Sequence, residues 1–216
     1  MADDGPAITT SFDESGVLTI TLDRPRSRNA LTPAGVRELC AALDEADDRD
    51  DVRAVVLTAA GRAFPVGADL SGGSRTFGSK GGSGGRDWGG VLALRLFECA
   101  KPIVAAVNGD AVGPGATMLL PADARIAVDT ASFGFVFTRR GIVPEACSSW
   151  FLPRVVGTCT AAQWTVSGGL IGAEEAHRAG LLTRCAPPRS CSPGPARPPA
   201  AWSPRVRPCR SRRPAA

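Results

Sequence analysis

Closely spaced glycines interrupt an apolar run in residues 106–127 of this 216-residue chain, which read AVNGDAVGPGATMLLPADARIA. Gly109, Gly113 and Gly115 let the backbone turn sharply and approach a ligand closely. An apolar strand before the glycines, and Pro114 at the start of a short helix, would aim backbone N–H groups at an electron-rich ligand. A glycine turn between a strand and a helix is more often only a turn. The motif alone therefore leaves both readings open.

Histidine and cysteine contribute little further chemistry. The single histidine, His177, lies in a pattern typical of a helix surface, and the seven cysteines show no short paired spacing. We therefore expect no metal site, no disulfide framework and no Ser-His-Asp triad. Most of the cysteines are expected to be small apolar core residues.

The composition predicts one soluble domain with an appendage. Hydrophobic residues make up 44% of the chain, which is enough for one good core. The chain has no apolar run of membrane-spanning length, and its N-terminus, MADDGPAITT, is acidic and polar. We expect a cytoplasmic protein with no membrane partner.

The positive charge is concentrated at the C-terminal end. Residues 187–216 hold seven arginines, nine prolines and no acid, which leaves 18 basic against 21 acidic residues in the rest of the chain. The tail has neither a strand nor a helix period, so we expect it to be disordered, with the folded core in residues 1–186. A nucleic-acid-binding role would rest on these arginines alone. Because they form no organised basic face, we expect no nucleic-acid partner.

Strands and helices alternate in the core. Two β-prone runs around Glu14–Gly16 predict a hairpin, and Thr32 with Pro33 predicts a helix that ends near Asp48. Ile103–Val107 are all apolar, as in a strand buried on both faces. Further strands are expected at 52–58, 124–128 and 181–185, and further helices at 88–99, 160–167 and 173–179, with another opened by Pro144 and Glu145. This order predicts an α/β fold built from right-handed crossover units.

Five segments, taken together, resemble the crotonase family of enoyl-CoA hydratases and isomerases. They are LDRPRSRNALT, GRAFPVGADL, KPIVAAVNGDAVGPGATMLLPADARIA, FTRRGIVPEACSSWFLPRVVG and SGGLIGAEEAHRAGLL, which follow the family's order within residues 8–186. The resemblance implies a spiral of ββα units and an acyl-CoA thioester as substrate. It implies no metal and no cofactor beyond the coenzyme A of the substrate. It also implies a homotrimer or hexamer.

The family stabilises a thioester enolate with two backbone N–H groups that form an oxyanion hole. The resemblance places one donor at Ala68. It places the other at Pro114, which has no N–H. The sequence thus departs from the family at a residue whose amide matters.

The hydratases of the family use two glutamates, and the resemblance places these positions at Thr117 and Phe137. Neither residue can act as a carboxylate base, so hydration by that mechanism is not expected. The segment PEACSSWFLP is similar to that of Δ3-Δ2-enoyl-CoA isomerases, in which a single glutamate moves a proton from C2 to C4; that residue is Glu145 here. A carboxylate in a helix's first turn would also complement the helix dipole, so a purely structural role stays open.

The family binds coenzyme A through the loop after the first hairpin and through the GADL segment. The expected substrate-binding residues are Arg26, Arg28, Ala30, Val66, Gly67, Ala68, Asp69, Leu70, Gly113, Pro114, Thr117 and Phe137. Arginines suit a phosphate, although a solvated surface loop explains them almost as well.

The resemblance stops near Arg184, where family members continue into a helical segment that covers the acyl pocket and builds the trimer. We expect this C-terminal helical segment to be missing, either because the tail is natively disordered or because the reading frame was lost. The sequence therefore predicts a Δ3-Δ2-enoyl-CoA isomerase-like enzyme. The alternatives are a catalytically impaired acyl-CoA-binding remnant and, less favoured, an enoyl-CoA hydratase.

Overall fold

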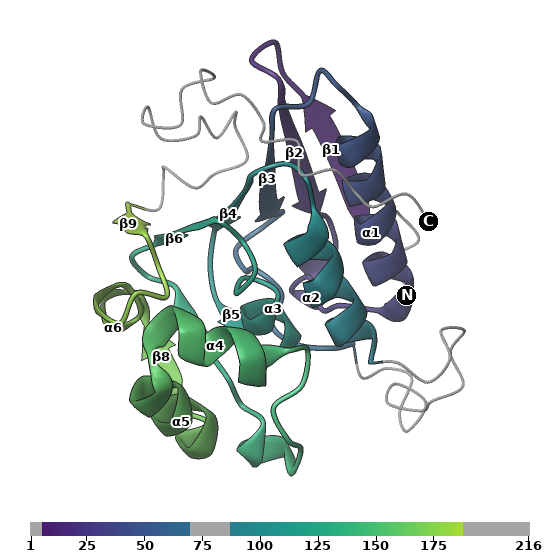
Figure 1. Ribbon diagram of the computed structural model, residues 1–216. Helices are drawn as coiled ribbons and strands as arrows, with labels where there is room; N and C mark the ends of the chain where they lie inside the picture. The colour runs from purple at the N-terminus through teal and green to yellow at the C-terminus, as the bar shows by residue number, and fades with distance from the viewer. Residues whose placement is uncertain (1–5, 70–86, 188–216) are drawn as a thin grey trace.

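A six-stranded sheet forms the centre of the computed structural model, which describes residues 6–69 and 87–187 (Figure 1). Its strand order is β1-β2-β3-β4-β6-β9, and every neighbouring pair is parallel except the hairpin β1-β2. A second sheet has the order β5-β7-β8. The strands are β1 (Ile8–Phe12), β2 (Val17–Leu22), β3 (Ala54–Ala59), β4 (Ile103–Val107), β5 (Ala111–Val112), β6 (Ala124–Val128), β7 (Ser132–Gly134), β8 (Leu170–Gly172) and β9 (Arg184–Ala186).

Two long helices, α1 and α2, lie side by side against one face of the large sheet (Figure 1). Helices α4, α5 and α6 lie together around β8, below β6 and β9 in the view of Figure 1. The Arg95 guanidinium of α2 joins the pair, with Nε 2.7 Å from Asp44 and Nη2 2.9 Å from Asp47, both on α1. The helices are α1 (Pro33–Asp48), α2 (Trp88–Glu98), α3 (Pro114–Thr117), α4 (Ser148–Val156), α5 (Thr158–Ser167) and α6 (Ala173–Arg178), and 3-10 turns occupy Pro25–Ser27 and Thr138–Arg140. In the described part of the chain, no helix has the length and apolar character needed to cross a membrane.

The start of α1 follows the capping signal in the sequence. The Thr32 side chain accepts a hydrogen bond of 3.0 Å from Gly35 N–H, and Pro33 occupies the first helical position. The predicted hairpin and the predicted end of α1 at Asp48 are also confirmed.

Strand β4 is buried on both faces, as its continuous apolar run predicts. Ile103, Ala105 and Val107 join the large core beneath the helices, whereas Val104 and Ala106 pack in a separate cluster. Alternate residues of one strand thus supply both layers of packing.

The chain then passes twice from the large sheet to the small one. Strand β4 leads into β5 and α3, and β6 leads into β7; β5 and β7 pair in parallel. These repeated strand–strand–helix units form the spiral that the resemblance implies, and the α/β fold class is confirmed.

One predicted helix start is wrong. Helix α4 begins at Ser148 rather than at Pro144, so Glu145 lies in the preceding loop and not in a first helical turn. Ala146 and Cys147 take positive φ angles of 52° and 56°, which non-glycine residues seldom adopt and which interrupt the helix there. The helix-dipole explanation of Glu145 therefore falls away.

Smaller differences concern the short strands. The last strand lies at Arg184–Ala186 instead of 181–185, and β5 and β8, which the sequence analysis did not predict, have only two and three residues. The expected disorder of 187–216 falls almost entirely outside the described residues.

Candidate active site

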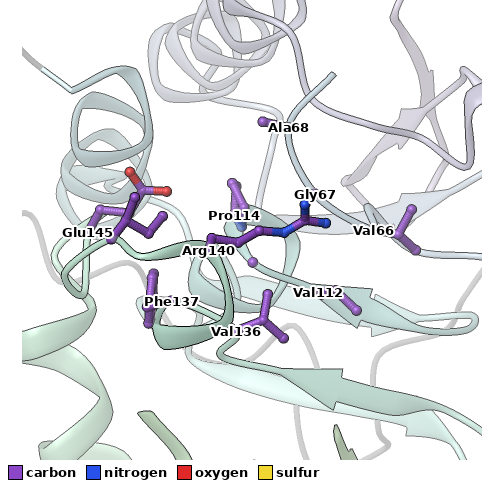
Figure 2. A pocket seen from close by; sticks show the side chains of 11 residues that line it. Val66, Gly67, Ala68, Val112, Pro114, Val136, Phe137, Arg140 and Glu145 are labelled. Carbon is purple, nitrogen blue, oxygen red and sulfur yellow. The ribbon is translucent and has the colours of Figure 1, made fainter. Parts of the chain in front are cut away.

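A cavity of about 310 Å³ lies where the loop after β3 meets the glycine turn, and it has the size of a small-ligand pocket. Figure 2 shows the side chains that line it. They are Val66, Gly67, Ala68, Val112, Gly113, Pro114, Val136, Phe137, Arg140, Ile142 and Glu145. Segments far apart in the sequence thus form one pocket, which contains all three residues predicted to be catalytic.

The glycines bring two walls of this cavity together. A Cβ atom on Gly115 would overlap the carbonyl oxygen of Pro65, and one on Gly109 would overlap that of Arg62. Only glycine allows the turn to pack this closely against the loop after β3. The glycine spacing in the sequence therefore has a packing reason that also builds the pocket.

Ala68 lines the cavity, and the hydrogen bonds of its neighbours show which way its backbone amide does not point. Leu31 N–H donates to Gly67 O at 2.9 Å, and Asp69 N–H donates to Leu31 O at 2.8 Å, which makes a short parallel bridge. Because backbone groups alternate along an extended segment, the amide of Ala68 points away from Leu31. It donates to no acceptor within the described residues, so it is available to a ligand.

Pro114 opens α3 and, as expected, offers no N–H at the cavity wall. The following amides of Ala116 and Thr117 both donate to Gly113 O, at 2.9 and 3.0 Å. Between them and Pro114, the Gly115 amide has no acceptor in residues 6–69 or 87–187. Gly115 is buried and is not among the cavity-lining residues, so its amide is a neighbouring donor behind the wall that Gly113 and Pro114 form.

Glu145 is the one carboxylate among the cavity-lining residues, and Figure 2 draws it at one end of the pocket, with Pro114 between it and Val66. Burial and, secondarily, the negative charge of Asp87 raise the pKa of its carboxyl group above the usual value. A raised carboxyl pKa strengthens the ionised group as a base.

Asp87 anchors the loop that carries Glu145. It caps α2 by accepting hydrogen bonds from Gly89 N–H at 3.0 Å and Gly90 N–H at 2.9 Å, and its Oδ2 also accepts from Ala146 N–H at 3.0 Å. One carboxylate thus joins the start of α2 to the positive-φ residue beside Glu145. Strained backbone of this kind is common at functional sites.

Of the two positions of the hydratase glutamates, only one is among the cavity-lining residues. Phe137 is buried and lines the cavity, where it supplies apolar wall. Thr117 is buried but does not line the cavity, and its hydroxyl donates to Pro114 O at 3.1 Å. Thr117 thus makes a hydrogen bond within α3, and its place in the substrate site stays a prediction.

The predicted coenzyme A residues divide in the same way. Val66, Gly67 and Gly113 line the cavity. Arg26, Arg28, Ala30 and Asp69 do not line the cavity. Arg26 is exposed, and the Arg28 guanidinium lies 3.6 Å from the Asp110 carboxylate. The Arg24 guanidinium donates to Ala30 O at 2.9 Å and forms an ion pair with Asp69 at 3.0 Å. Leu70 lies outside the described residues. The loop after the hairpin thus does not line the cavity itself, but Leu31 joins it to the wall at Gly67 and Ala68.

The sequence analysis missed two polar residues of the site, Asp87 and Arg140. Asp87 follows a glycine-rich stretch, and its contact with Ala146 spans 59 positions of sequence. Arg140 belongs to the pair Arg139-Arg140, and nothing in the sequence indicates which of the two enters a pocket. Neither residue carried a signal beyond its charge.

The described residues contain no group of three or more His, Cys, Asp or Glu side chains that could hold a metal ion.

Comparison with known proteins agrees with this geometry. The model of the enoyl-CoA hydratase/isomerase family matches residues 13–191. The chain belongs to this family. An enoyl-CoA hydratase of Alternaria alternata is 41% identical over 187 residues, which cover 87% of this chain and 61% of that protein. The 1,2-epoxyphenylacetyl-CoA isomerase of Escherichia coli is 35% identical over 177 residues, which cover 80% of this chain and 67% of that one.

The fold of this enoyl-CoA hydratase/isomerase family member also matches solved structures. The crystal structure of an enoyl-CoA hydratase/isomerase from Pseudoalteromonas atlantica superimposes with a TM-score of 0.77 at 37% identity, covering 86% of this chain and 71% of that one. The crotonase resemblance is thus confirmed. The chain spans 61% of the Alternaria alternata hydratase above and 58% of two others from that organism.

Proposed function

We propose that this chain is the acyl-CoA-binding core of an enzyme that moves a double bond from C3 to C2 of an enoyl-CoA. The observation that supports this most is that Glu145 is the one carboxylate among the described residues that line the cavity, in the same pocket as Ala68. Isomerisation needs one base and no added water, whereas the family's hydration mechanism needs two carboxylates.

In the proposed reaction the Glu145 carboxylate removes a proton from C2. The C–H electron pair forms a C1–C2 double bond, and the thioester oxygen takes the negative charge while Ala68 N–H donates to it. The same glutamic acid then returns the proton at C4. The C3–C4 π electrons form the new C4–H bond, the C1–C2 π electrons move to C2–C3, and the oxygen lone pair re-forms the thioester carbonyl. Glu145 is again a carboxylate, so no other reactant is consumed.

The test is conversion of 3-hexenoyl-CoA to 2-hexenoyl-CoA by the full chain, with hydration of 2-hexenoyl-CoA assayed beside it. We expect isomerisation that Glu145→Gln abolishes, and negligible hydration because Phe137 and Thr117 replace carboxylates. Robust hydration with no isomerisation would overturn the proposal and favour the activity in the Alternaria relative's name.

A second candidate, an acyl-CoA-binding protein with impaired catalysis, is favoured by one observation. Pro114 withholds an N–H from the cavity wall. Tight binding of hexenoyl-CoA without turnover would support this candidate. A homotrimer or hexamer, as in the family, stays a prediction for either case.

A further inference from the structure

Arg140 places a positive charge in the cavity. It ends the 3-10 turn Thr138–Arg140, which follows the apolar wall formed by Phe137. Figure 2 shows its side chain extending past Pro114, with the guanidinium drawn next to the Gly67 label and away from Glu145. The positive charge therefore lies on the Gly67 side of the cavity.

The turn that carries Arg140 is fixed in place. Arg140 N–H donates to Phe137 O at 2.9 Å, and the Thr138 hydroxyl donates to Val166 O of α5 at 3.1 Å. The preceding arginine, Arg139, packs on the α5 side, where a Cβ atom on Gly168 would lie 3.1 Å from its Cγ. The two arginines thus lie on different sides of one anchored turn, and only Arg140 lines the cavity.

No carboxylate within the described ranges lies near enough to pair with Arg140. The ion pairs found there involve other arginines, and the only acid of the cavity, Glu145, is not within 4 Å of it. Arg140 is an exposed residue that also lines the cavity, so its guanidinium is accessible both to water and to a ligand in the pocket. Among ligand groups, an anionic oxygen is the acceptor that best replaces the water around a guanidinium.

We propose that Arg140 is an anion-binding residue of the acyl pocket, whose guanidinium pairs with a negatively charged oxygen of the bound acyl-CoA. The inference rests on the proposed function, because it takes an acyl-CoA as the ligand. A guanidinium donates in a fixed fork and binds oxygen anions more strongly than neutral oxygens.

Two oxygens of an acyl-CoA have this chemistry. One is the thioester oxygen in its enolate form, for which Arg140 would supply the donor that Pro114 lacks. The other is a carboxylate at the far end of the acyl chain, which would make the substrate a dicarboxylic acyl thioester. Either oxygen would bind the same Arg140 guanidinium in the same cavity. Two probes distinguish binding of the enolate oxygen from binding of the acyl carboxylate.

The experiment compares the full-length protein with Arg140→Gln and with Arg139→Gln, which removes the same charge from the same turn outside the cavity. The first probe pair is glutaryl-CoA and pentanoyl-CoA, which have equal chain length and differ in a terminal carboxylate. If Arg140 binds an acyl carboxylate, the wild type prefers glutaryl-CoA by at least about tenfold, and Arg140→Gln abolishes that preference.

The second probe is acetoacetyl-CoA, whose enolate is detected by its ultraviolet absorbance. If Arg140 binds the enolate oxygen, Arg140→Gln raises the pH midpoint for enolate formation in the complex by about one unit or more. Arg139→Gln leaves both readings at the wild-type values.

Unchanged glutaryl preference together with an unchanged enolate midpoint in Arg140→Gln would overturn the inference while leaving the proposed function intact. Failure of the wild type to bind any of the three thioesters would remove the proposed function and this inference with it. Circular dichroism of each variant identifies loss of folding. In that case Arg140→Lys, which keeps the charge without the planar fork, replaces Arg140→Gln and is expected to keep only part of either effect.

Discussion

Glu145 has the environment of a base rather than of a structural acid. Its carboxylate lines a cavity, its pKa is raised by burial and by Asp87, and no hydrogen bond within the described residues accounts for that shift. Glu145 also lies before the first residue of α4, so an interaction with the dipole of that helix does not account for an acid at this position. Replacing it should therefore change chemistry much more than folding.

We expect Glu145→Gln to lower isomerase kcat by about 100- to 10,000-fold, the usual contribution of a general base, while binding of hexenoyl-CoA stays within about twofold. The reason is that the amide keeps the volume of the side chain and loses the base. Steady-state kinetics and calorimetric titration measure the two quantities. Equal rates in both proteins would exclude Glu145 as the base.

Pro114 predicts a gain of function. Loss of one oxyanion donor costs about 100- to 1000-fold in rate, so restoring an amide at this position should raise isomerase kcat. We expect Pro114→Gly to give at least about a tenfold increase, allowing for imperfect placement of the new N–H. Pro114→Ala is the matched variant, because it restores the same amide and keeps a Cβ atom.

An unchanged rate in both folded Pro114 variants would mean that the oxyanion is already satisfied. Gly115, whose amide has no acceptor among the residues described, and Arg140 are then the candidates. Combining Pro114→Gly with Arg140→Gln separates them, since only a shared role makes the two effects non-additive.

Between elements, the start of α2 and the loop before α4 act as one unit through Asp87. Its carboxylate satisfies two orphan amides of α2 and the amide of Ala146. The negative charge of Asp87 raises the pKa of Glu145. Arg140 adds a positive charge to the residues that line the cavity. The position of the base and its pKa therefore depend on a residue of another element.

We expect Asp87→Asn to move the acidic limb of the kcat/KM–pH profile to lower pH. Glu145 must be ionised to act, and its pKa is raised in part by the charge of Asp87; removing that charge lowers the pKa, so the active form persists further into acid. Asp51→Asn, at an exposed ion pair with Arg49, is the matched loss of one negative charge and should leave the limb in place. A shift toward higher pH would contradict this account.

The elements with strong local signals were predictable, and those that depend on tertiary contacts were not. The Thr32-Pro33 cap and the apolar run of β4 decide structure within a few residues. By contrast, β5 has two residues, and the contacts that order it are tertiary: it pairs with β7, and Val112 N–H donates to Pro65 O. The late start of α4 depends on left-handed backbone at Ala146 and Cys147, which neither residue type favours.

The residues of the candidate site show the same difference between local sequence signals and tertiary contacts. Ala68, Pro114 and Glu145 could be assigned because motifs mark them, and the structure brings them to one cavity. Arg140 and Asp87 could not be assigned from the sequence. The role of Arg140 depends on which side of its turn the side chain lies, and that of Asp87 depends on its contact with a loop that is distant in the sequence. The place of Thr117 in the substrate site stays a prediction, since its hydroxyl donates to Pro114 O and the residue is not among those that line the cavity.

For the molecule as a whole, β9 is the last element of the described fold. It pairs in parallel with β6 along Arg184–Ala186, and Asp129 N–H donates to Ala186 O at 3.0 Å. The composition of the following residues, with nine prolines and seven arginines in 187–216, predicts that they add no packed surface. The boundary of the cooperative unit should therefore fall directly after β9.

Two truncations test this boundary. A chain ending at Pro187 should keep the melting temperature of the full protein to within about 2 °C, because it loses no packed apolar surface. A chain that ends at Thr183 lacks β9, which exposes the hydrogen-bonding edge of β6 and removes Ala186 from the core. Its melting temperature should therefore fall by about 4 °C or more. Calorimetry of the three proteins measures both effects. A large loss of stability in the chain ending at Pro187 would show that residues 188–216 belong to the folded body, and would contradict the prediction of a disordered tail.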